Sequence, residues 1–156
     1  MDISDSLAAS VTALDAQRRR LNVIASNLAN AQSTRTPEGG PYKRRDVVFQ
    51  AAPLRPKFQS ALRQASMQSG HPAPATGRED LQGVRVARVI EDHKPGQAIY
   101  DPKHPDADDK GFVRLPNVNV MEEMVNMIGA SRAYEANVQA VNATRTMWAR
   151  ALDIGK

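Results

Sequence analysis

One acidic stretch of this 156-residue chain has residue types and spacing that could bind a metal ion, Asp106-Ala-Asp108-Asp109-Lys110-Gly111. It matches a calcium loop only in part, because Asn117 stands at the twelfth position, where such a loop needs a carboxylate that binds through both oxygens. The three histidines lie in loop-like sequence without the i,i+4 spacing of helical metal ligands, and the chain has no cysteine. We therefore predict a turn at this stretch and no metal or other cofactor.

Two basic runs, Arg18-Arg19-Arg20 and Lys43-Arg44-Arg45, could contact phosphate groups. The first run would cover several faces of a helix, no aromatic residues are interleaved with it, and the net charge of the chain is only +4. The chain also lacks a G-x-S-x-G nucleophile motif, a Gly-rich phosphate loop and an H-E-x-x-H zinc motif. We predict no nucleic-acid partner, no small-molecule substrate and no enzymatic activity.

The distribution of proline predicts the elements that position these side chains. All ten prolines lie between Pro37 and Pro116, and proline breaks helix interiors. We predict an N-terminal helix within 1–34, a Pro/Gly-rich β or irregular segment at 35–116 and a C-terminal helix within 117–156. In the middle segment we expect a short helix at 58–67, a mobile loop near 69–83, and β-prone stretches at 42–49, 84–90, 97–100 and 112–115, the last two pairing across the loop between them.

Both ends of the chain carry apolar residues at alternating steps of three and four, which is the spacing of a helix-pairing seam. This pattern predicts a mainly α fold, in which long N- and C-terminal helices pair as a coiled coil beside a small irregular or β middle segment. The N-terminal seam comprises Leu7, Leu14, Leu21, Ile24 and Leu28. We expect it to pack against a C-terminal seam of Met124, Met127, Tyr134, Val138, Val141, Trp148 and Leu152.

The outer faces of the two expected helices lack the charges that a solvated helix normally carries. Segments 21–34 and 137–144 contain no charged residue. Such faces suit helices that pack side by side on several faces, so we interpret both ends as assembly helices. Gly129 lies inside the second helix and marks either a close approach between helices or a tolerated local weakness.

Several motifs resemble the bacterial flagellar axial proteins, the family of rod, hook and hook-associated subunits. The Asn-Leu-Ala-Asn core at 27–30 is shared across that family, and the Thr-Arg-Thr-Pro-Glu-Gly-Gly-Pro-Tyr run at 34–42 resembles its proximal-rod members. The stretches 100–107, 116–120, 123–127 and 130–137 fit the same members, whereas Gln32-Ser33 departs from the usual Asn-Thr. The residues that carry this resemblance and its expected subunit contacts are Asn27, Leu28, Ala29, Asn30, Thr36, Pro37, Glu38, Gly39, Gly40, Pro41, Tyr42, Arg44, Arg45, Arg132, Tyr134, Glu135 and Asn137.

The resemblance implies a structural subunit of the flagellar proximal rod. Such a subunit would be exported unfolded by the flagellar type III export apparatus and would polymerise through its terminal helices into a periplasmic shaft that transmits motor torque. Its expected partners are other copies of itself, other rod proteins, the export apparatus, and the MS ring or the base of the export gate. The residues alone leave a second reading open, a soluble coiled-coil adaptor or chaperone that binds a partner helix.

Overall fold

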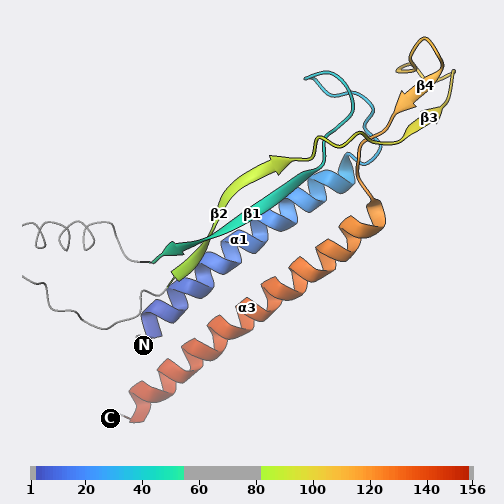
Figure 1. Ribbon diagram of the computed structural model, residues 1–156. Coiled ribbons are helices and arrows are strands. Elements are labelled where there is room, and N and C mark those ends of the chain that lie inside the picture. Colours follow the sequence, from blue (N-terminus) through green and yellow to red (C-terminus); the bar gives the residue numbers. More distant parts are fainter. Residues whose placement is uncertain (1–2, 55–81, 155–156) are drawn as a thin grey trace, which may run out of the picture.

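The computed structural model describes residues 3–54 and 82–154, which form two long helices and four strands. Helix α1 spans Ile3–Ala29 and helix α3 spans Val120–Ile154. With 27 and 35 residues, they are about 40 and 50 Å long at 1.5 Å per residue. The C-terminal end of α1 lies beside the N-terminal end of α3, and both chain termini lie at the opposite end (Figure 1).

The strands form two separate antiparallel pairs. Strand β1 (Arg45–Pro53) pairs with β2 (Gln82–Glu91) in a register that joins Arg45 to Glu91, with one irregularity between Val48 and Phe49. Strand β3 (Ala98–Tyr100) pairs with β4 (Phe112–Arg114). The predicted pairing across the acidic loop is thereby confirmed. The β3–β4 hairpin projects beyond the helix ends, away from both chain termini (Figure 1).

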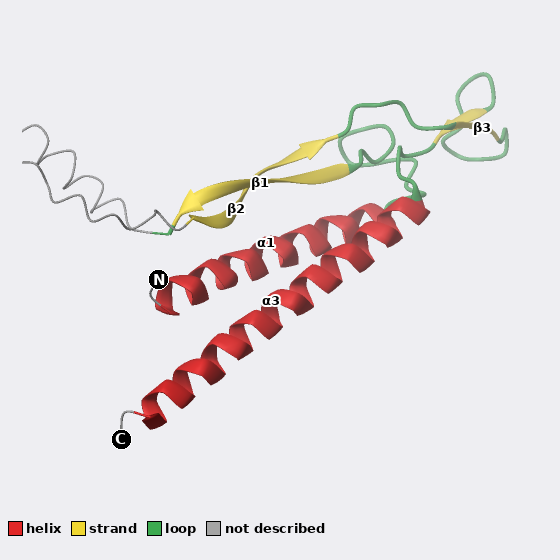
Figure 2. Ribbon diagram, turned by 60° about the horizontal axis from the view of Figure 1, so that its bottom comes forward, coloured by secondary structure: helices red, strands yellow, loops and turns green. Residues whose placement is uncertain are grey.

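The predicted fold class, mainly α with the terminal helices paired as a coiled coil, is wrong. The chain is a mixed α and β structure in which the long β1–β2 ribbon lies along α1, so α1 has two neighbours (Figure 2). The helices lie closest where α1 ends and α3 begins, and they separate towards the chain termini. The heptad pattern was misleading because α1 packs against the two strands as well as against α3. In addition, α3 is about 12 Å longer than α1.

Helix α1 and strand β2 approach each other closely at Thr12 and Gly83. The backbone N–H of Val84 donates a hydrogen bond of 3.1 Å to Thr12 Oγ1, whose hydroxyl in turn donates to the carbonyl of Ala9. A Cβ atom at Gly83 would lie only 2.6 Å from Thr12 Oγ1, so a larger residue cannot fit there without a shift. Ala16, one turn further along α1, is buried. Small residues thus let the ribbon lie against the helix.

The helix ends match the chemistry expected of them. Asn119 Oδ1 accepts hydrogen bonds from the backbone N–H groups of Met121 and Glu122, so Asn119 is the N-cap of α3. The acidic stretch forms a turn, since Asp108 Oδ1 accepts from the N–H groups of Lys110 and Phe112. The predicted helix at 58–67 lies outside the described residues, as does most of the predicted loop at 69–83, whose last two residues begin β2. No helix in the described part of the chain is long and apolar enough to cross a membrane.

Candidate assembly surface and the polar joint that orients it

A buried polar joint connects the two helices at the end where they meet. Asn27 on α1 is fully buried, and both its amide hydrogens and its oxygen are satisfied. Its Nδ2 donates to the carbonyl of Arg45 at 2.8 Å and to Glu123 Oε2 at 2.9 Å, while its Oδ1 accepts from the hydroxyl of Tyr42 and the N–H of Arg45, both at 3.0 Å. One amide therefore ties α1, the entry to β1 and α3 together.

The second member of the joint is a buried ion pair. Glu123, in the first turn of α3, is 1 % exposed. Its Oε1 accepts a hydrogen bond of 2.8 Å from Nε of Arg44 and lies 2.8 Å from Nη2 of the same guanidinium in an ion pair. Burial alone would lower the pKa of Arg44, but the hydrogen bond and charge of Glu123, with Asp46 and Glu122 nearby, outweigh burial and raise it. Arg44 therefore stays charged, and the pair fixes where α3 begins.

The loop that follows α1 closes on itself and on the β3–β4 hairpin. The N–H and hydroxyl of Thr36 both donate to the carbonyl of Gly40, and Gly39 and Gly40 have φ angles of +88° and +77°, which glycine adopts without strain. The hydroxyl of Thr34 donates to Asp106 Oδ2 at 2.8 Å. The 34–42 run is therefore a shaped projection beside the hairpin.

The predicted motif residues occupy three settings. Asn27 and Tyr42 are buried in the joint, and Asn30 ends α1 by donating from Nδ2 to the carbonyl of Ser26. The surface of the loop is formed by Pro37, Glu38, Gly39 and Gly40, which are exposed. Arg44 is a half-buried member of the joint, and Thr36 and Pro41 are half-buried within the loop. The remaining motif residues are half-buried or exposed on the helices or at the start of β1, namely Leu28, Ala29, Arg45, Arg132, Tyr134, Glu135 and Asn137.

The predicted seam residues are covered to different degrees. Ile24 is buried, and a half-buried group comprises Leu7, Leu14, Leu21, Leu28, Met127, Tyr134, Val138 and Val141. About half or more of the surface of each remaining residue is exposed, namely Met124, Trp148 and Leu152. The most buried residues of α3 are Glu123 and Ala130, neither of which belongs to the predicted seam. Sequence reasoning missed Glu123 because glutamate is almost never fully buried without a partner, and its partner lies 79 residues away.

A second apolar surface on α3 is exposed in the single chain. We call it the outer stripe, and it comprises Val120, Met121, Met124, Val125 and Ile128. These positions fall on one side of a helix, and each side chain is between 44 and 72 % exposed. Contiguous exposed apolar surface is typical of sites that contact another protein, a membrane or a ligand. Among the described residues, no group of acidic and histidine side chains is arranged to hold a metal ion.

The two ends of the chain match family models of flagellar rod proteins. Residues 7–35 match the model described as "Flagella basal body rod protein", and residues 109–154 match "Flagellar basal body rod FlgEFG protein C-terminal". These segments contain most of α1 and α3, together with the joint residues Asn27 and Glu123. The class of protein is therefore that of the flagellar rod subunits.

Full-length relatives narrow the class. The chain is 42 % identical over 158 residues to the flagellar basal-body rod protein FlgC of Borreliella burgdorferi, covering 99 % of this chain and 98 % of that protein. It is 43 % identical to FlgC of Yersinia enterocolitica, covering 93 % and 92 %, and 41 % identical to FlgC of Bacillus subtilis, covering 97 % of each. The chain belongs to the FlgC family of flagellar basal-body rod proteins. It is a structural subunit of the rod in the flagellar basal body, in a family that is not one of enzymes.

Proposed function

We propose that this rod subunit polymerises in the proximal rod through its terminal helices, and that the outer stripe of α3 is the part of each subunit that a neighbouring subunit covers. The stripe is the observation that carries the proposal. A single chain leaves five large apolar side chains exposed over about two and a half turns of α3. Covering them contributes about 25 cal/mol per Å² of apolar surface. The partners are other copies of the chain and other rod proteins.

The last turns of α3 support the same proposal. Trp148 and Leu152 continue the α1-facing side of α3, but the helices separate there, and both side chains remain about half or more exposed. A helix from a neighbouring subunit can pack against Trp148 and Leu152, where α1 no longer covers α3. The predicted seam residues at this end thus become contacts between subunits.

The polar joint supports a role in transmitting torque. A rod subunit must keep its helices at a fixed angle under load, and the Asn27–Glu123–Arg44 joint connects three segments with no unsatisfied polar atom on Asn27. Buried, satisfied networks of this kind rigidify the elements they join. Export in an unfolded state by the flagellar type III apparatus, and attachment near the MS ring or the export-gate base, belong to the proposal through the resemblance to the rod family.

The test is complementation of a strain whose own gene for this subunit is deleted. Val125→Asp places a carboxylate in the outer stripe, and Ala51→Asp places the same group at an exposed position of β1 as the matched control. We expect the Val125→Asp protein to fold, as judged by circular dichroism, and to be exported, as judged by immunoblot. It should be absent from purified basal bodies, and the cells that express it should be non-motile. Normal swimming with Val125→Asp would overturn the proposal, and so would an equal loss of swimming with Ala51→Asp.

A further inference from the structure

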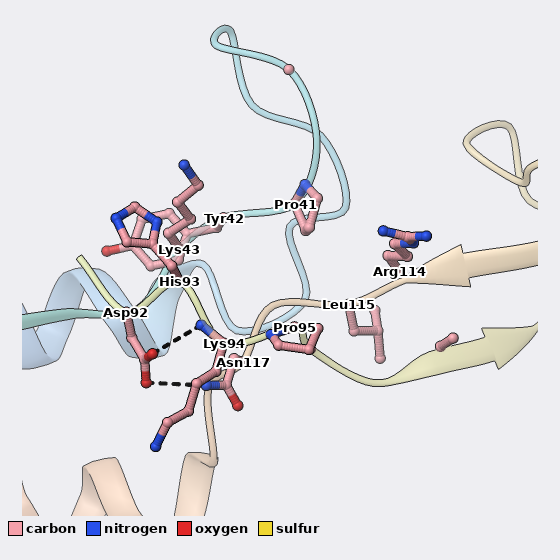
Figure 3. A pocket seen from close by; sticks show the side chains of 13 residues that line it. Pro41, Tyr42, Lys43, Asp92, His93, Lys94, Pro95, Arg114, Leu115 and Asn117 are labelled. Atoms are coloured by element: carbon pink, nitrogen blue, oxygen red, sulfur yellow. Dashed lines mark hydrogen bonds between the residues drawn. The ribbon is translucent and has the colours of Figure 1, made fainter.

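A cavity of about 420 Å³ lies at the base of the β3–β4 hairpin, beside the loop that follows α1. Figure 3 shows Pro41, Pro95 and Leu115 in its middle, with Lys43 and Lys94 towards one end and Arg114 at the other. The cavity therefore combines apolar surface with a basic rim. Its size is that of a site for a small molecule or a few side chains.

The positive charge of the rim is not neutralised within the described part of the chain. Asp92, the carboxylate that lines the cavity, is held in place by the N–H of Lys94 at 3.0 Å and by Asn117 Nδ2 at 3.2 Å. Within residues 3–54 and 82–154, the side chains of Lys43, Lys94 and Arg114 make no ion pair. Three cations face one carboxylate, so the cavity favours an occupant with negative charge.

The cavity is formed by rigid backbone. Gly96 lies directly against the backbone carbonyl of Leu115, at a separation that leaves no room for a Cβ atom. The N–H of Leu115 donates to the carbonyl of Gln97 at 2.8 Å, which fixes the two segments that form the wall. A site that is already formed costs little conformational entropy to occupy.

The tip of the same hairpin has the complementary chemistry. The rings of Tyr100 and Phe112 meet edge to face with centroids 5.3 Å apart, and Tyr100 is 65 % exposed. The loop between them, residues 101–111, carries four aspartates and two lysines. It is held in shape by hydrogen bonds from the N–H of Asp101 to the carbonyl of Gly111 and from the N–H of Asp108 to the carbonyl of Phe112. The tip is thus aromatic, acidic and ordered.

We propose that the basic cavity of one subunit receives the aromatic and acidic β3–β4 tip of a second copy of this chain. The aromatic rings meet the apolar floor, the guanidinium of Arg114 can lie over a ring, and the loop carboxylates meet the lysines. A chain cannot fill its own cavity, because Ala98 and Arg114 at the cavity and Tyr100 and Phe112 at the tip are rungs of one short ladder.

The contact joins two different surfaces, so each bound copy presents a free tip or a free cavity to the next copy. Such a head-to-tail contact builds a ring or a helical row rather than an isolated pair. This inference rests on the proposed polymerisation of the subunit and assigns one of its contacts. That contact is separate from the outer stripe on α3.

The natural absence of cysteine makes a cross-linking test specific. Lys94→Cys and Asp109→Cys variants with distinguishable tags are co-expressed in the deletion strain and treated with a short flexible bis-maleimide. Both side chains are exposed, and neither makes a described hydrogen bond. We expect a heterodimer carrying both tags, and none when either variant is expressed alone. Ala51→Cys replaces Lys94→Cys in the matched control, which should give no heterodimer.

Incorporation of the tagged chains into basal bodies is measured in the same cells. Three outcomes would overturn the tip-in-cavity contact alone. They are tagged protein in the rod without a heterodimer, a cross-link from Lys94→Cys to a different rod protein, and an equal yield of heterodimer with Ala51→Cys. Absence of the tagged wild-type chain from basal bodies would overturn the proposed function instead.

As a second measurement, Lys94→Glu and Asp109→Lys should each reduce the swimming halo, and their combination should restore it. No recovery in the double variant would contradict the pairing of charges.

Discussion

The two helices of this subunit differ in how much of their apolar surface the chain itself covers. Among the described side chains, α1 leaves one large apolar residue exposed, Val11, whereas α3 leaves eight. Helix α1 lies between α3 and the β1–β2 ribbon, and α3 contacts α1 along one side. The difference supports our proposal that α3 completes its packing only when subunits assemble, whereas most of the packing of α1 forms when the chain folds. On this proposal, folding of the chain buries apolar residues of α1, and assembly of subunits buries those of α3.

The largest expected effect on folding comes from breaking the joint between the two helices. Asn27→Ala removes four hydrogen bonds and leaves Glu123 and the hydroxyl of Tyr42 buried with fewer partners. Leaving buried polar partners without their hydrogen bonds costs about 1–3 kcal/mol. The free energy of unfolding, measured by urea denaturation of the purified subunit, should fall by that amount.

Asn22→Ala is the matched control for this prediction, because Asn22 is exposed on the same helix. An exposed substitution of this kind changes stability by less than about 0.5 kcal/mol. If the two variants lose equal stability, the joint does not hold the helices together.

A smaller effect is expected where α1 meets the ribbon. Thr12→Val keeps the shape of the side chain but removes the acceptor for the N–H of Val84. The expected loss of unfolding free energy is about 1 kcal/mol, that of one hydrogen bond. Thr146→Val is the control, since the hydroxyl of Thr146 donates to the carbonyl of Asn142 within its own helix. Similar losses in the two variants would mean that the ribbon adds nothing to α1 through Thr12.

The smallest effect is expected on the open side of α3, and it has the opposite sign. A Cβ atom at Gly129 would meet no atom of the described residues within 4 Å, so the close helix approach considered from the sequence does not occur between α1 and α3. Gly129→Ala should stabilise the isolated subunit by about 0.5–1 kcal/mol in thermal unfolding. If the Gly129→Ala subunit is more stable but no longer supports swimming, the backbone of a neighbouring subunit packs against Gly129 in the rod. Destabilisation of the isolated subunit would contradict the open space.

The extent of the helices and the strand positions could be predicted from the sequence, since proline placement and apolar spacing are local signals. The relation between the helices could not. Periodicity marks every apolar face of α3, including Met124 in the outer stripe, and does not say which face meets α1 and which meets another subunit. The residues that decide this, Asn27 and Glu123, are polar and lie 96 positions apart. The basic cavity also escaped prediction, because Lys43, Lys94 and Arg114 come together only through the close approach of Gly96 to Leu115.

The central claim, that the outer stripe is open in the single subunit and covered in the rod, can be measured by thiol labelling. Val125→Cys introduces the sole thiol of the chain at a position whose native side chain is 67 % exposed. We predict that a maleimide labels the purified subunit rapidly and labels subunits in isolated basal bodies at least about tenfold more slowly, because a covered thiol reacts only when the contact opens. Equal labelling rates in the subunit and in the basal body would contradict the account.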